Sequence, residues 1–89
     1  HKATRPDGVD VWIARAPGQA LPDWIACVRR ALSQDVDPAT LCKVSDPWTD
    51  AEGNTHQVYT CRGPNETQQE MCDRHEEEVA AMQEAFPCV

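Results

Sequence analysis

Cys72 and His75 are the residues whose types and spacing most directly suggest chemistry. They stand three positions apart in the run MCDRH, so on a helix they would occupy neighbouring positions. Thiolate and imidazole groups bind zinc, and together with Met71 and Met82 they could hold Cu(I). A structural zinc site needs about four ligands, commonly spaced as pairs, and no second pair occurs in the sequence. We therefore expect His75 to be a half-buried, hydrogen-bonded histidine rather than a metal ligand.

The sequence offers no clear catalytic group. A reactive thiolate needs partial exposure and positive surroundings, whereas Cys72 is followed by the acids Asp73, Glu76 and Glu77. No serine lies in a GxSxG elbow, and neither a P-loop nor a GxGxxG motif is present. The run from Asp50 to Asn54 resembles a calcium loop in composition but lacks the EF-hand spacing. We expect a chain without catalytic residues, bound metal or cofactor.

Five cysteines in 89 residues suggest disulfide bonds. They occur at irregular spacing without a CxxC pair, which argues against a zinc ribbon or a thioredoxin-type motif. Four of them can be paired, with one left over, in 15 ways that the sequence alone does not distinguish. We favour pairing Cys27 with Cys42 and Cys61 with Cys72, which leaves Cys88 as the unpaired thiol.

Disulfides place the chain in an oxidising compartment, so we expect a periplasmic or secreted protein. No stretch approaches the roughly 20 apolar residues of a membrane span. The sequence starts with His1 and contains no signal peptide, which we interpret as a mature or trimmed form. The odd thiol also suggests a homodimer joined through a cysteine.

The net charge of −7 is concentrated near the end of the chain. Up to residue 62, seven Lys or Arg face eight acids; beyond it, Arg74 alone faces seven acids. An acidic field repels nucleic acid, whose binding depends on Lys and Arg, and it favours basic protein partners. A solvated face that only keeps the chain soluble is the alternative.

Two segments have helical periodicity. Residues 65–88 place apolar side chains on one face and acids on the other, with Asn65 as the N-cap, Gln68 in the capping box and Pro87 as the stop. Residues 21–34 form a second amphipathic helix, with Pro22 in its first turn. Both helices are expected to cover a small core.

The remaining elements are strands. Residues 9–15 alternate apolar and polar side chains, and residues 42–45 and 57–62 predict a hairpin with a long loop. Residues 1–8 are expected to be a flexible arm, ahead of a single domain over residues 9–89. The order strand, helix, strand, strand, helix predicts an α+β domain with a disulfide-stapled antiparallel sheet of about three strands and two helices on one face.

These features favour a small exported, non-catalytic protein-binding domain, such as an inhibitor or immunity-type protein that blocks a basic enzyme or toxin. Two alternatives remain open: a metal- or redox-handling protein that uses Cys72 and His75, with Met71 and Cys88, and a structural subunit completed by another chain. The binding surface is expected either on the acidic helix or on the loop with an exposed Trp48 ring. The candidate contact residues are Trp48, Asp50, Glu52, Glu70, Glu77 and Glu84.

Overall fold

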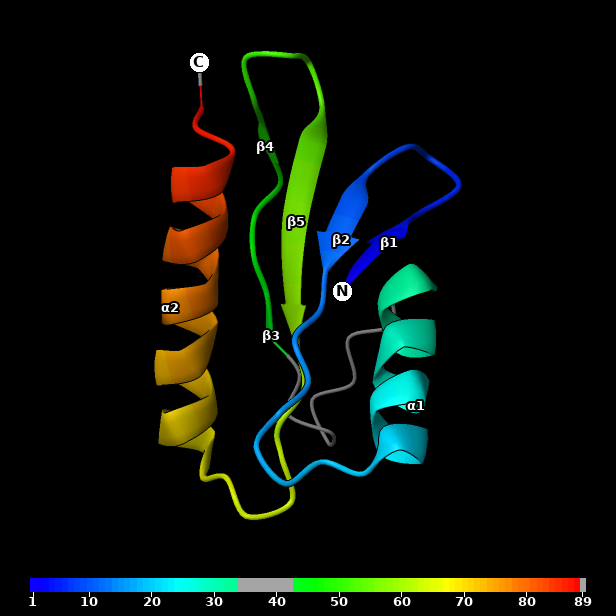
Figure 1. Cartoon of the computed structure of the whole chain (residues 1–89), viewed down its shortest axis with the longest axis vertical. Helices are drawn as coiled ribbons and strands as arrows, with labels where there is room; N and C mark the ends of the chain where they lie inside the picture. Colours follow the sequence, from blue (N-terminus) through cyan, green and yellow to red (C-terminus); the bar gives the residue numbers. More distant parts are fainter. Residues whose placement is uncertain (34–42, 89) are drawn as a thin grey trace.

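Two helices enclose a mixed five-stranded sheet in the described part of the chain (Figure 1). This computed structural model describes residues 1–33 and 43–88. The elements are β1 (Lys2–Thr4), β2 (Asp10–Trp12), α1 (Leu21–Leu32), β3 (Lys43–Val44), β4 (Trp48–Thr49), β5 (Thr55–Thr60) and α2 (Gln68–Ala85). The predicted α+β class is confirmed, but the sheet has five strands among the described residues rather than about three.

Strand β5 is central to the sheet. It pairs with β2 on one side and with β3 and β4 on the other, and β1 extends the sheet beyond β2. The β2–β5 pair is parallel, with Val11 opposite Gln57, so the expected antiparallel sheet is wrong in this respect. Parallel neighbours need a long crossover, and α1 lies in the connection between them.

The first eight residues are not the flexible arm that the sequence suggested. Lys2–Thr4 form β1 and pair antiparallel with β2, in a register that puts Ala3 opposite Val11. The turn closes at Gly8, whose φ of 91° suits glycine, and the Gly8 amide donates to the Arg5 carbonyl at 2.9 Å. The polar segment therefore belongs to the sheet.

The helices cover opposite faces of the sheet, which corrects the expectation that both pack on one face (Figure 1). Successive side chains of a strand alternate between faces. Tyr59 belongs to the core cluster with Cys27 of α1, whereas the next residue, Thr60, contacts His75 of α2. The consecutive buried residues Val58, Tyr59 and Thr60 follow from this arrangement, because both faces of β5 are covered.

The disulfide also lies on the α1 face. Cys27 of α1 is bonded to Cys61, which follows β5, and both are buried. The favoured pairing of Cys27 with Cys42 and Cys61 with Cys72 is therefore wrong, because Cys61 is bonded to α1 whereas Cys72 lies on α2, across the sheet. Cys42 lies outside the described residues. Neither Cys72 nor Cys88 has a disulfide bond to a described residue.

The start of α2 is displaced by two residues from the expected cap. Thr67, not Asn65, is the N-cap: its hydroxyl accepts a bond from the Glu70 amide at 3.1 Å, and its own amide donates to the Glu70 carboxylate at 3.2 Å. This T-x-x-E arrangement is a complete capping box. The helix ends at Ala85, two residues before Pro87.

Candidate functional site

Arg74, the only cation of α2, lies between the helix and the sheet. Its guanidinium donates two bonds to Glu66, at 2.8 and 3.0 Å, one to Glu78 at 2.7 Å and one to the Cys61 carbonyl at 2.6 Å. The hydrogen bonds from Arg74 lower the pKa of Glu66, and Glu66 raises the pKa of Arg74. The group therefore anchors α2 and is not available to neutralise acids on the outer surface.

A second hydrogen-bonded chain joins β5 to the same helix. The Thr60 hydroxyl donates to Glu78 at 3.0 Å, and its oxygen lies 2.8 Å from Nδ1 of His75. Since the single hydroxyl proton goes to the carboxylate, Nδ1 of His75 must carry a proton and donate to Thr60. Burial, together with the charges of Lys43 and Arg74, lowers the pKa of His75. The expected hydrogen-bonded histidine is confirmed.

The tautomer leaves Nε2 of His75 unprotonated, beside a surface groove between β3 and α2. Lys43, Ser45 and Glu76 contribute polar groups to that groove. A neutral imidazole fixed through Nδ1 is the usual arrangement of a metal-binding histidine. Among residues 1–33 and 43–88, however, no group of three or more His, Cys, Asp or Glu residues is placed to hold a metal ion.

The loop that was expected to display Trp48 is folded onto α2. Trp48 is only 8% exposed, and its indole N–H donates to the Phe86 carbonyl at 2.9 Å. Asp50 is also buried, and its carboxylate accepts bonds from the amides of Glu52 and Asn54. The expected exposure of Trp48 is wrong, because the ring is needed to join the loop to the helix end. Glu52 alone of the three loop candidates is exposed.

His56 lies in a hydrogen-bonded cluster of the kind found at active sites, although the sequence did not indicate it as a candidate. Trp12 Nε1 donates to its Nδ1 at 3.1 Å, so the other nitrogen, Nε2, carries the proton and donates to Asp50 at 2.7 Å. The hydrogen bond from His56 is the main cause that lowers the pKa of Asp50. The ring of Phe86 stacks on His56, with 4.4 Å between centroids.

The cluster around His56 has the features of a stabilising core rather than of a catalytic site. His56 is 2% exposed, both of its nitrogens are occupied, and rings from β2, β4 and the end of α2 surround it. A general base must reach the proton that it removes, and His56 has no free nitrogen with which to do so. The cluster instead fixes Trp12 beside the end of α2.

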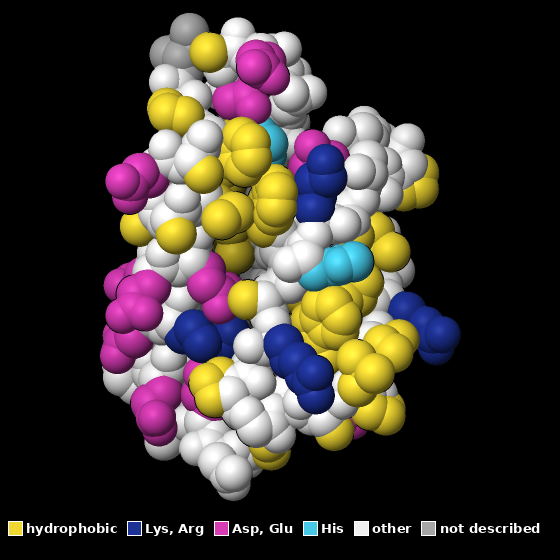
Figure 2. Space-filling view, in the orientation of Figure 1, with side chains coloured by type: hydrophobic (Ala, Val, Ile, Leu, Met, Phe, Trp, Pro, Cys, Tyr) yellow, Lys and Arg dark blue, Asp and Glu magenta, His cyan; other side chains and the backbone are white. Residues whose placement is uncertain are grey.

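The acidic candidates on α2 lie on its outer surface. Glu70, Glu77 and Glu84 are exposed, and none of them forms an ion pair with a described residue. Their seven-residue spacing aligns them along the helix, about 10.5 Å apart. We call these three residues the acidic row. Figure 2 shows acidic side chains along the α2 side of the molecule, with apolar side chains between that helix and the strands.

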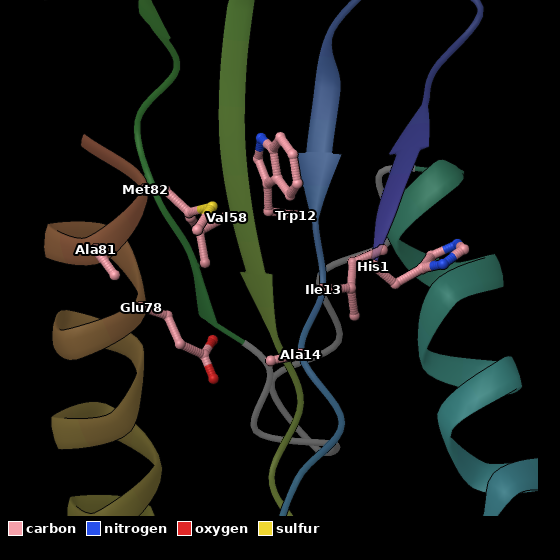
Figure 3. Close-up of a pocket in the computed structure, with 8 residues that line it drawn as sticks. All are labelled: His1, Trp12, Ile13, Ala14, Val58, Glu78, Ala81 and Met82. Atoms are coloured by element: carbon pink, nitrogen blue, oxygen red, sulfur yellow. The ribbon is translucent and has the colours of Figure 1, made fainter. Parts of the chain in front are cut away.

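An apolar pocket lies next to this surface. It has a volume of about 140 Å³ and is formed between α2, β5 and the segment around β2 (Figure 3). Trp12, Val58 and Met82 line one end, Glu78 lies lower on the α2 side, and His1 points toward α1. The complete lining is His1, Trp12, Ile13, Ala14, Val58, Glu78, Ala81 and Met82. Of these residues the sequence singled out only Met82, as a ligand of a conceivable Cu(I) site, and it did not indicate the pocket.

The comparisons with known proteins leave the function to be argued from these features. Protein-family models, curated proteins and solved structures all gave no match to the chain. In the part of the chain that the structure describes, neither helix has the length and apolar character required to cross a membrane.

Proposed function

We propose that this chain is a small exported, non-catalytic protein-binding domain that docks a basic partner through the acidic row of α2. In this role it acts as an inhibitor or immunity-type protein and covers a basic surface of an enzyme or toxin. The acidic face of the helix, rather than the folded loop around Trp48, supplies the contact. Charge complementarity would speed the encounter and select against acidic partners.

The observation that carries this proposal is the inward position of Arg74. Arg74 is the positive charge of α2, and its ion pairs with Glu66 and Glu78 hold that charge between the helix and the sheet. Glu70, Glu77 and Glu84 are consequently exposed without a countercharge among the described residues. Exposed carboxylates of this kind act mainly on the rate and specificity of association.

The disulfide supports the exported part of the proposal. Cys27 and Cys61 are bonded, and structural disulfides persist mainly in the periplasm or outside the cell. Joining residues 34 positions apart restricts the unfolded chain and stabilises a small domain by roughly 4 kcal/mol. Such a protein can remain folded without a large core while it presents a charged surface.

A capture experiment tests the docking surface. The immobilised protein is exposed to the exported proteins of its source, and bound proteins are identified by mass spectrometry at low and physiological salt. The variant Glu70→Gln/Glu77→Gln/Glu84→Gln should lose a partner of high pI that the unchanged protein retains. The matched variant Asp23→Asn/Asp46→Asn/Glu52→Gln removes three exposed acids elsewhere and should retain it. Loss of the partner only in the matched variant would move the docking site away from α2 and contradict the proposal.

A structural subunit completed by another chain is a second candidate, and α1 provides the observation in its favour. Leu21 and Ile25 are 50% and 39% exposed, and exposed apolar residues that lie one turn apart often belong to an interface. Sedimentation of the protein over a range of concentrations tests this role. A dimer that is lost in Leu21→Ser/Ile25→Ser would support it, whereas a monomer at all concentrations would exclude self-association through α1.

A further inference from the structure

We propose that the apolar pocket between α2 and β2 receives one apolar side chain of a basic amphipathic helix, which lies along the acidic row. This inference rests on the proposed function and specifies the form of the partner. The pocket supplies an anchor point, and Glu70, Glu77 and Glu84 supply the matching charge. The occupant is therefore a helix of another protein, with apolar residues on one stripe and Lys or Arg beside it.

The size and lining of the pocket suit a single apolar side chain. Its volume is about 140 Å³, and a cavity of about 150 Å³ can hold a benzene molecule. Trp12, Val58 and Met82 form apolar walls at one end (Figure 3). Burying a Phe or Leu side chain there would contribute about 1.5–3 kcal/mol to association. A phenyl or isobutyl group is the expected anchor.

The walls of the pocket are held in place before any partner arrives. The Trp12 indole donates to His56 at 3.1 Å and stacks against Phe86, with 5.3 Å between ring centroids. Val58 lies on the central strand and is 1% exposed. Since these side chains are already ordered, binding would cost less conformational entropy than it would at a mobile surface.

Glu78, the carboxylate that lines the pocket, does not require a cation from the partner. One of its oxygens accepts from Arg74 at 2.7 Å and the other from Thr60 at 3.0 Å. An apolar group can therefore enter the pocket without leaving this carboxylate unpaired. The positive charges of the partner are instead required outside the pocket, along the acidic row.

The helical positions of α2 place the pocket and the acidic row side by side. At 100° per residue, Ala81 lies 20–60° from Glu70, Glu77 and Glu84 on the α2 surface. Ala81 also lines the pocket and is exposed. Its short side chain leaves room for a second helix to approach α2. A partner helix with Lys or Arg at seven-residue intervals would follow the same line as the row.

Two synthetic peptides of 18 residues test the proposal by titration calorimetry with the complete chain. The first is an amphipathic helix with Lys at seven-residue intervals and one Phe in its apolar stripe. The second has the same composition in an order that removes the stripe. We expect the amphipathic peptide to bind at least about tenfold more tightly, a difference of about 1.4 kcal/mol. Equal binding of the two peptides would overturn the pocket proposal.

Two substitutions at exposed alanines of α2 locate the contact. Ala81→Phe places a ring at the pocket and should weaken the amphipathic peptide at least about tenfold. Ala80→Phe, which lies 100° around the helix from Ala81 and lines a different groove, should weaken it much less. Circular dichroism and thermal unfolding confirm that both variants are folded. Undiminished binding to Ala81→Phe, or no binding of the amphipathic peptide to the unchanged protein, would overturn the proposal.

The proposed function can survive that failure and be recognised separately. If both peptides bind equally and both are weakened in Glu70→Gln/Glu77→Gln/Glu84→Gln, the acidic row binds basic partners without using the pocket. If the triple substitution has no effect on either peptide or on the captured partner, docking through the acidic row itself is wrong.

Discussion

α1 and α2 cover opposite faces of one sheet, but different interactions attach them to it. The α1 face holds the Cys27–Cys61 disulfide and an apolar cluster that includes Val11, Ile13 and Tyr59. The α2 face holds the network of Arg74 with its carboxylates, and the aromatic rings around His56. A covalent and apolar attachment is indifferent to salt and moderate pH, whereas the ionic attachment depends on both. The attachment of α2, the helix that presents the acidic row, should therefore respond more strongly to salt and pH than the attachment of α1.

Removing the disulfide should have the largest effect and should act on the α1 side. Cys27→Ala/Cys61→Ala is expected to lower the free energy of unfolding by roughly 4 kcal/mol, because the unfolded chain regains the freedom of a long loop. Urea unfolding measures the loss, and hydrogen exchange should show that α1 amides lose protection first. Cys88→Ala, at an exposed position, is the control and should change little. Equal stability of the double variant would contradict the assignment of the α1 attachment to the bond.

Removing the central cation should have the next largest effect, on the α2 side. Arg74 is only 15% exposed in its side chain, so Arg74→Met leaves Glu66 and Glu78 partly buried without their cation. Loss of one partner from such a group costs about 3 kcal/mol. The variant should unfold at lower urea, with α2 amides exchanging faster while the α1 amides next to the disulfide keep their order of protection.

Arg29→Met provides the matched control for that comparison. Arg29 is exposed on α1 and has no ion pair with a described residue, so its loss should alter stability by less than about 0.5 kcal/mol. A similar loss in both variants would show that the Arg74 network has no special role in attaching α2.

The same comparison explains which parts of the structure could be predicted from sequence. The amphipathic periodicity of residues 68–85 and 21–32 is local, so both helices and the α+β class could be predicted. The exact N-cap could not, because Asn65 and Thr67 both offer capping side chains; the matched Glu70 decides in favour of Thr67. Strand β1 was missed because its short polar segment lacks an apolar alternation and gains its structure from pairing with β2.

The disulfide pairing and the pocket depend on contacts between distant segments. The register of β5 decides that Cys61 lies on the same face of the sheet as α1. The spacing of the cysteines in the sequence does not show this. One signal was present: the run from Val58 to Cys61 is uninterrupted by a charged residue, as expected for a strand with both faces covered. This pattern predicts helices on opposite faces of the sheet. Trp12, Val58 and Ala81 are far apart in sequence, so the pocket that they line has no local motif.

Titration of His75 has the smallest predicted effect on stability. It tests most directly whether the two faces of the sheet differ in their response to pH. Burial lowers the pKa of His75 below its ordinary value of 6.5, so the unfolded chain takes up a proton at a higher pH than the folded chain. Its contribution to stability is therefore present above pH 6.5 and is lost as the pH falls through the lowered value. The groups near the ring are Thr60 on β5, Lys43 on β3, and Arg74 and Glu76 on α2.

His75→Asn removes this titration while keeping an N–H that can donate to Thr60. Urea unfolding between pH 7.5 and pH 5 should show a smaller decline in stability for the variant than for the unchanged chain. His1→Asn, at an exposed position, is the control and should keep the original decline. The difference should also appear as earlier exchange of α2 amides, not α1 amides, when the unchanged chain is acidified. Identical pH profiles for His75→Asn and the unchanged chain would remove His75 as a source of the pH response, and the contrast between the two faces would then rest on the Arg74 network alone.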